Sequence, residues 1–367
     1  MDNAASTRVS PRVLAKFNEV ANEIYGNPSS KHNEGLLANK CIEETKENIS
    51  SFLNCNPNEI YFTCGATMSN NVLIQGVLRR HPETMFITST VEHNDIMELY
   101  DWLPYSKQMI SVDEFGIIDF NQLWNILIDC SNAKKPCLVS IQMANSETGI
   151  KQPIDQISSL VHEYGGFLHV DATQYIPYYP VDVDAMGIDA LSMSGQKIGG
   201  IKGSGLLYVR KVLSNNITPI IFGDQGFIGG TPSTPLISSL GEAFKNIKYD
   251  ATSLIHKRDI LLTHLENLGG ILVGTKDNRI PNNIFIRFPG VNGLTLMDLL
   301  NARGIYIGTG SACSTDSDKP SHVALAYGLT DKEALECVRF TLSKDTTYEE
   351  IEYVVRILKG ILPLLYN

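Results

Sequence analysis

Short apolar runs alternate with longer segments of helical periodicity through the first two thirds of the chain. Runs typical of buried strands cover residues 59–62, 85–88, 137–143, 166–170, 190–193 and 205–209. Between them, apolar residues recur at helical spacing in residues 67–80, 94–103, 120–128 and 154–162. This alternation predicts an α/β fold with a mainly parallel sheet flanked by helices.

The pattern changes from about Pro235. It predicts one long helix over residues 236–268, strands near 284–288, 305–307 and 337–342, and a last helix from Tyr348. We therefore expect a large α/β domain over residues 12–241. Residues 242–367 are expected to form a smaller α+β domain, onto which residues 1–11 fold back.

Composition and charge narrow the range of functions. The chain has 367 residues, 43% of them hydrophobic, which is enough to bury a sizeable core. The net charge of -10 argues against a general nucleic-acid binder, because such a protein needs a basic face. No apolar run is long enough to cross a bilayer, and no signal-like segment begins the chain. We therefore expect a cytoplasmic protein, with no membrane contact, whose partner is a small molecule or a protein.

The seven cysteines are scattered without CxxC spacing, and their number is odd. This fits neither a disulfide framework nor a zinc site, so no metal is expected. Most of them, including Cys64 and Cys337, are expected to be small core residues. A reactive cysteine must therefore be identified by its surroundings.

Two strand ends carry side chains suited to cofactor chemistry. The segment LSMSGQK (191–197) places Ser194 and Lys197 after an apolar strand and before a glycine-rich loop. A lysine there can form a Schiff base with an aldehyde cofactor, while Ser194 can hold a phosphate. The segment FLHVDATQ (167–174) places Asp171 at a strand end, where a carboxylate can keep a pyridine nitrogen protonated. Taken alone, a solvated turn and a helix cap are the commoner explanations.

A third strand end opens directly into a helix. Residues 63–71 read TCGATMSNN, so that the helix expected from Thr67 follows Gly65. Anions bind at such helix N-termini, because the backbone N–H groups there point outwards. This segment therefore adds a candidate phosphate site to the same sheet edge.

Further motifs turn these separate signals into a family resemblance. They are DNAAS (2–6), GNPSS (26–30), EHN (92–94), NSETG (145–149), GSACS (310–314), PSH (320–322) and VRFTL (338–342). Taken in this order with the segments above, they resemble the cysteine desulfurases, a branch of the class V aminotransferases. The resemblance runs from Asp2 to the final helix. It implies a pyridoxal-phosphate enzyme of fold type I, with a seven-stranded type of sheet.

The resemblance assigns cofactor roles residue by residue. It implies that Lys197 is the Schiff-base lysine, that Asp171 pairs with the ring nitrogen, and that His93 stacks on the ring as an acid/base. The other cofactor contacts that it implies are Ala66, Thr67, Gln174, Ser194, Gln196 and Thr231. Without the resemblance, His93 would more often be a surface histidine.

The resemblance also assigns substrate and sulfur contacts. Arg339 matches the arginine that clamps the carboxylate of L-cysteine, and Asn145, Ser146 and Asn27 fall at further substrate positions. Cys313 matches the sulfur-accepting nucleophile. It lies in a loop of small polar residues, about 309–320, which we expect to be mobile and to expose the thiol.

The sequence departs from the family at three places. Gln196 replaces a histidine before the lysine, and Ser146 replaces a second asparagine, so that Arg339 would carry more of the substrate orientation. Residues 222–231 resemble a shortened form of the loop that crosses a dimer interface. The arginine of that loop is absent, but Thr231 matches the threonine that contacts the neighbouring subunit's phosphate, which implies a homodimer.

The favoured hypothesis is a cysteine desulfurase that releases L-alanine and holds a persulfide on Cys313 for a protein acceptor. Selenocysteine lyase or a C–S β-lyase on the same fold is the alternative enzyme. A non-catalytic scaffold, whose partner does the chemistry, is the alternative from another class. Iron-sulfur cluster assembly, RNA thiolation and maturation of another enzyme all stay open as pathways.

Overall fold

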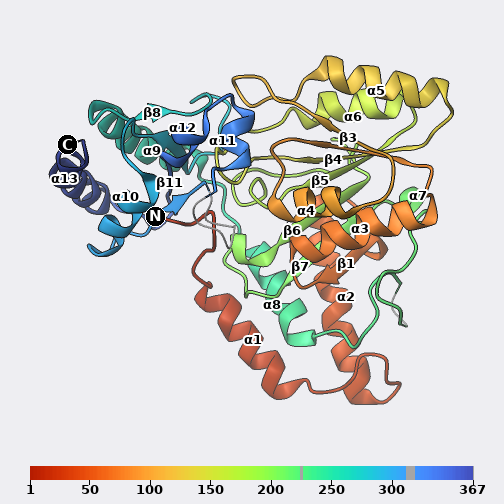
Figure 1. The fold of residues 1–367 in the computed structure, drawn as a ribbon. Coiled ribbons are helices and arrows are strands. Elements are labelled where there is room, and N and C mark those ends of the chain that lie inside the picture. Colours follow the sequence, from red (N-terminus) through yellow and green to blue (C-terminus); the bar gives the residue numbers. More distant parts are fainter. Residues whose placement is uncertain (224–225, 311–318, 367) are drawn as a thin grey trace.

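A computed structural model describes residues 1–223, 226–310 and 319–366. A seven-stranded sheet forms its larger part, with the order β1-β7-β6-β5-β4-β2-β3 (Figure 1). β7 runs antiparallel to its two neighbours, and the other neighbouring strands are parallel. The strands are β1 Ile60–Thr63, β2 Met85–Ser89, β3 Lys107–Ile110, β4 Cys137–Gln142, β5 Phe167–Asp171, β6 Ala190–Ser194 and β7 Gly205–Val209.

Helices cover both faces of this sheet. Buried side chains of α3, α4 and α7 pack on one face. Those of α2, α5, α6 and α8 pack on the other face. The helices around this sheet are α1 Pro11–Glu23, α2 Asn33–Leu53, α3 Ala66–Arg80, α4 Asn94–Trp102, α5 Phe120–Asn132, α6 Ile154–Glu163, α7 Lys211–Ser214 and α8 Thr234–Lys245.

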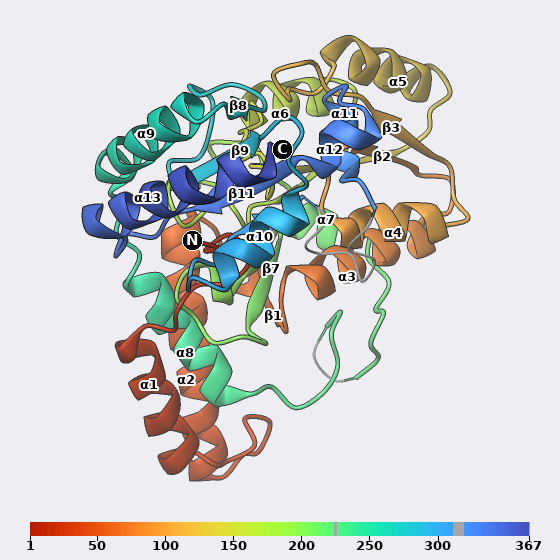
Figure 2. The ribbon, with the colours of Figure 1, turned by 60° about the vertical axis from the view of Figure 1, so that its left-hand side comes forward.

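A second, four-stranded sheet has the order β10-β11-β9-β8 and is antiparallel throughout. Its main core lies against α9, α10 and α13, and a smaller core lies beside α11 and α12. In both ribbon views the N-terminus lies next to this sheet (Figures 1 and 2). Its elements are β8 Ile271–Leu272, β9 Asn283–Arg287, β10 Gly308–Thr309, β11 Cys337–Thr341, α9 Ala251–Asn267, α10 Gly293–Asn301, α11 His322–Ala326, α12 Asp331–Leu335 and α13 Tyr348–Leu365.

The predicted α/β fold with a mainly parallel sheet is confirmed, and two predicted elements are wrong. The helix expected over residues 236–268 is two helices, because α8 ends at Lys245 and the side chain of Asp250 caps a new helix start. The strand expected at 305–307 lies instead at Gly308–Thr309, where the backbone pairs with β11. Among the described residues, no helix combines the length and the apolar character needed to cross a membrane.

Candidate active site

Three of the expected cofactor residues come together where β5 and β6 end. Asp171 is the last residue of β5, and Gln174 follows in the next turn. Lys197 ends a short 3-10 helix that directly continues β6, the parallel neighbour of β5. Nε2 of Gln174 and Nζ of Lys197 both donate hydrogen bonds to the carbonyl oxygen of Ala4, across 3.0 and 2.5 Å. Parallel pairing therefore gathers these side chains at one edge of the sheet.

The N-terminus of α3 lies beside this edge. Gly65 precedes the helix with a φ of +150°, a conformation that other residues rarely adopt. The backbone N–H of Ala66 donates to Oγ of Ser194 across 2.8 Å, which joins the helix start to the end of β6. Thr67 follows in the first helical turn and is exposed. Backbone N–H groups and hydroxyls of this kind are the donors that a phosphate needs.

A polar network leads from the partly exposed His93 to the buried Asp171. Nδ1 of His93 lies 2.9 Å from Oδ1 of Asp95, and Asn70 donates to both Asp95 and Asp171 across 3.2 Å. Burial favours the neutral form of Asp95, but hydrogen bonds from His93, Thr67 and Asn70 lower the pKa of Asp95 overall. Burial raises the pKa of Asp171, and the negative charge of the nearby Asp95 raises it further. A cationic ring nitrogen would relieve this cost at Asp171.

Arg339 lies on β11 and reaches the turn that follows β4. Its Nη1 donates to the carbonyl oxygen of Ser146 across 2.8 Å. Asn145, the residue before Ser146, is 2% exposed, and its side-chain amide donates to the carbonyl oxygen of Val91 across 2.8 Å. The side-chain oxygen of Asn145 accepts backbone N–H groups two and three residues further along. Asn145 therefore holds the turn whose backbone meets Arg339.

Two buried carboxyl groups lie within the sequence motifs but received no predicted role. Glu92 is fully buried, accepts from Oγ of Ser89 and from the backbone of Gln142, and has its pKa raised to about 8 by burial. Glu147 accepts a 2.5 Å hydrogen bond from Oγ of Ser321, and burial raises its pKa to about 7. A glutamate in a turn motif carries no local sign of burial, so sequence reasoning could not identify them.

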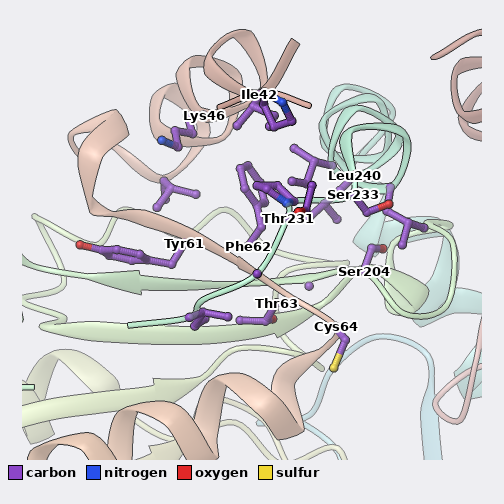
Figure 3. Close-up of a pocket in the computed structure, with 18 of the residues that line it drawn as sticks. Ile42, Lys46, Tyr61, Phe62, Thr63, Cys64, Ser204, Thr231, Ser233 and Leu240 are labelled. Carbon is purple, nitrogen blue, oxygen red and sulfur yellow. The ribbon is translucent and has the colours of Figure 1, made fainter. Parts of the chain in front are cut away.

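Three further expected contacts stand apart from this network. Gln196 lies next to Lys197, where its carbonyl oxygen accepts from Thr7 across 2.8 Å. Asn27 is exposed in the connection between α1 and α2, and its side chain accepts from the backbone of Ser29. Thr231 is exposed in the wall of a separate cavity (Figure 3). The structure therefore does not place Asn27 and Thr231 with the lysine and arginine of the same chain.

This cavity has a volume of about 680 Å³ and lies between α2, β1 and the segment before α8. Cys64 lines it and is exposed, so the expectation of a core position for Cys64 is wrong (Figure 3). The reason is that Cys64 follows the last residue of β1, in the turn before α3. Cys337 is buried as predicted. Cys313, the predicted nucleophile, lies outside the described residues.

A family model described as aminotransferase class-V matches residues 1–354. The chain belongs to the class-V aminotransferase family. A cysteine desulfurase IscS from Methanosarcina thermophila is 33% identical over the whole of this chain and 92% of its own length. A probable mitochondrial cysteine desulfurase from Dictyostelium discoideum is 34% identical over 98% of this chain and 82% of its own length. These findings confirm the family that the sequence motifs predicted.

Solved structures of this class-V aminotransferase family share the fold. A NifS-like protein superimposes with a TM-score of 0.89 at 30% identity, covering 99% of this chain and 98% of its own. A structure titled SspA in complex with cysteine has a TM-score of 0.81 at 32% identity, covering 93% of this chain and 97% of its own. Similarity of this extent confirms the expected fold type of the whole chain.

Pyridoxal phosphate is the cofactor of the class-V aminotransferases, and the side chains at this edge fit it. The start of α3 with Ser194 suits a phosphate, Asp171 suits the ring nitrogen, and Lys197 suits the aldehyde. Within the described part of the chain, Oδ1 of Asn70 is a buried acceptor without a hydrogen-bond partner, beside the Asp171 carboxylate to which Nδ2 of the same residue donates. The backbone N–H of Thr173 also donates to that carboxylate. These polar groups suit a polar ring.

Proposed function

We propose that this class-V aminotransferase is a cysteine desulfurase, which removes sulfur from L-cysteine and releases L-alanine. One observation carries the proposal. Lys197 and Arg339 both contact residues 2–5, because Lys197 donates to Ala4 and Ala5 while Arg339 pairs with Asp2. The lysine that would receive the amino group and the arginine that would receive the carboxylate therefore contact the same short segment of the chain, as a small α-amino acid requires.

The roles of individual side chains follow from their chemistry. When bound, the cofactor withdraws electrons from the substrate's α-carbon. The Asp171 carboxylate holds the ring nitrogen in its protonated form, and Thr67 and Ser194 hold the phosphate. Nζ of Lys197 moves the proton at the substrate's α-carbon, and Gln174 donates to the ring hydroxyl. His93 would stack on the ring and act as an acid/base.

Substrate orientation depends chiefly on Arg339. Its planar guanidinium binds the cysteine carboxylate, and Asn145 and Ser146 keep the neighbouring turn in place. Asn27 and Thr231 are proposed to act from the other subunit of a homodimer, because they lie apart from Lys197 within one chain. Thr231 would then contact the phosphate, and Gln196 would donate to the same group.

The transfer balances without an outside oxidant. The thiolate of Cys313 attacks the sulfur of cysteine, so that an S–S bond forms as the C–S bond breaks. The bonding electrons stay with the substrate carbon, which takes up a proton to become alanine. Cys313 is left as a persulfide, which a protein acceptor then receives.

Replacement of the proposed nucleophile tests this function. Cys313→Ser should still bind cysteine, since Lys197 and Arg339 are unchanged, but it should release no alanine and carry no persulfide. Mass spectrometry of the protein after incubation with cysteine measures the extra sulfur atom. Cys64→Ser, which removes an exposed cysteine outside the proposed chemistry, is the matched control. Alanine release by Cys313→Ser near the parent rate would exclude the proposed route.

Measurement of the small-molecule products, namely alanine, pyruvate, sulfide and selenide, separates the alternative enzymes. A β-eliminating C–S lyase would yield pyruvate and sulfide from cysteine in place of alanine. A selenocysteine lyase would release selenide and favour the selenium substrate. A non-catalytic scaffold would give none of these products with any of the substrates.

The proposal extends to assembly and location. We expect a homodimer, supported by the exposed Phe222, at 78% exposure, in the segment that resembles the family's interface loop. We favour a cytoplasmic location, and iron-sulfur cluster assembly as the pathway that uses the sulfur. Co-purification with a scaffold protein that accepts the sulfur would test that pathway.

A further inference from the structure

The first residues of the chain run along β11, the strand that carries Arg339. The backbone N–H of Thr341 donates to the carbonyl oxygen of Met1 across 2.8 Å, and Oγ1 of Thr341 accepts from the N–H of Ala4 across 3.0 Å. Asp2 forms a parallel bridge with Thr341. Because Arg339 and Thr341 are two residues apart on one strand, both point to the same face. The backbone pairing therefore places Asp2 beside Arg339.

Asp2 supplies a carboxylate to the arginine that is proposed to bind the substrate's carboxylate. Oδ1 of Asp2 accepts from Nη2 of Arg339 across 2.8 Å, while Nη1 is held by Ser146. The side chain of Arg339 is 4% exposed, whereas that of Asp2 is 30% exposed. The chain thus provides its own counter-ion to a buried guanidinium, and that counter-ion remains in contact with solvent.

A further donor of the same guanidinium, Nε, lies beside Gly308. Nε of Arg339 is buried and makes no hydrogen bond within the described part of the chain. Gly308 lies opposite, and a Cβ there would come within 2.9 Å of Nη2, 3.2 Å of Nε and 3.2 Å of Oδ1 of Asp2. Nε and Nη2 form one edge of the guanidinium, which suits the two oxygens of a carboxylate. Asp2 takes Nη2, one of the two donors that this edge offers.

We propose that Asp2 is a resident carboxylate on Arg339 that the incoming substrate carboxylate must displace, so that Asp2 sets the affinity for cysteine. The inference rests on the proposed function, since it concerns the carboxylate of that substrate. Two carboxylates at one guanidinium repel each other, and displacement of Asp2 breaks a charge-assisted hydrogen bond. The N-terminal segment therefore weakens substrate binding at the site that it helps to build.

The test compares Asp2 variants of the cofactor-loaded protein, with the purification tag at the C-terminus so that residues 1–5 are unchanged. Asp2→Asn keeps an oxygen at the Oδ1 position and removes the charge, Asp2→Ala removes both, and Asp2→Glu keeps the charge. Glu23→Gln removes an exposed charge from the last residue of α1 and is the matched control. Calorimetry measures binding of 3-mercaptopropionate, which has the thiol and carboxylate of cysteine but no amino group. Cysteamine, which has no carboxylate, is the second probe.

Asp2→Asn and Asp2→Ala should bind 3-mercaptopropionate roughly three- to tenfold more tightly, as expected for removal of a partly exposed competing charge. Binding of cysteamine should not change, and Asp2→Glu and Glu23→Gln should behave as the parent does. In Asp2→Asn and Asp2→Ala, the KM for cysteine should fall by a factor similar to that of the dissociation constant of 3-mercaptopropionate. Unchanged or weaker binding in both uncharged variants would overturn the inference. A parent protein that forms no alanine would refute the proposed function instead, and the calorimetric comparison does not depend on alanine.

Discussion

The carbonyl oxygen of Ser146 accepts a hydrogen bond from Nη1 of Arg339 across 2.8 Å. Ser146 follows β4 of the large sheet, and Arg339 lies on β11 of the small sheet, so this contact joins the two sheets at the candidate site. Asp2 holds the other terminal nitrogen, Nη2, of the same guanidinium. Once Asp2 is displaced, a guanidinium that Ser146 keeps in place can bind a carboxylate through two parallel hydrogen bonds.

Arg339→Lys should therefore raise the KM for cysteine more than it lowers kcat. The ammonium group of lysine is a single point charge and cannot keep both Ser146 and a carboxylate in a planar arrangement. Loss of a hydrogen bond to a charged group costs about 1.5–3 kcal/mol, so we expect a rise in KM of roughly 10- to 100-fold. Steady-state alanine formation measures both constants.

Arg287→Lys is the matched control for this change. Arg287 lies on the neighbouring strand β9 and pairs with Glu333 and Glu336. Its replacement should leave the KM for cysteine within about twofold of the parent value, because lysine keeps the positive charge and both carboxylates that Arg287 pairs with lie outside the candidate site. Equal rises in KM for both variants would show that the effect is one of small-sheet stability and not of carboxylate binding.

Lys197 should become covalently attached to the cofactor on reduction with borohydride. Its Nζ lies at the edge of the sheet beside Asp171 and Gln174, where the aldehyde is proposed to bind. The protein should be yellow, and peptide mapping should find the label on Lys197. Lys197→Ala should lose the label, while Lys202→Ala, at an exposed lysine of the following loop, should keep it. A label on any other lysine would move the cofactor away from the proposed site.

The strands of the large sheet were predictable where they are buried on both faces. Mainly apolar runs such as those of β4 and β7 need no knowledge of their neighbours. β3 was missed because it is an edge strand of four residues, next to β2, and begins with two polar side chains. The break after α8 was also missed, because residues 246–250 continue an apolar spacing although Asp250 starts a new helix.

The candidate site was predictable from motifs and not from its contacts. Lys197 and Asp171 carry their chemistry in residue type and in position after a strand. The pairing of Asp2 with Arg339 joins residues 337 positions apart, so no local pattern could indicate it. The proposed roles stay predictions, as does the division of the chain into residues 12–241 and residues 242–367 with 1–11.

The stability of the protein should depend on the protonation of Glu92. Burial raises the pKa of this carboxyl from 4.5 to about 8, so the folded state holds a proton that the unfolded chain releases. The contribution of Glu92 to the free energy of unfolding is then fully present below about pH 4.5. It is lost as the pH rises to about 8, by up to about 1.4 kcal/mol per pH unit. Urea unfolding at fixed cofactor saturation between pH 5 and pH 8 measures this slope.

Glu92→Gln should reduce that slope and leave the part that comes from Glu147, whose pKa is raised to about 7. The amide has the same shape as the protonated carboxyl, and it can donate to Oγ of Ser89 while accepting from the backbone of Gln142. Glu23→Gln, at an exposed glutamate of α1, should keep the slope of the parent. An identical pH dependence for Glu92→Gln and the parent would mean that Glu92 is charged in the folded state.

Thr231→Ala should weaken cofactor retention in a way that depends on protein concentration. Thr231 is exposed in a cavity wall apart from Lys197, so its proposed contact with the phosphate requires a second subunit. Loss of one hydrogen bond to a charged phosphate costs about 1.5–3 kcal/mol, which corresponds to roughly 10- to 100-fold weaker binding. Absorbance of the bound cofactor after dilution measures cofactor release, and sedimentation at the same protein concentrations measures the fraction of dimer.

Ser233→Ala, at a second exposed hydroxyl of the same cavity wall, is the control and should retain the cofactor as the parent does. If the parent sediments as a monomer and keeps both cofactor and activity, Thr231 has no partner phosphate to contact, and the proposed dimer is wrong.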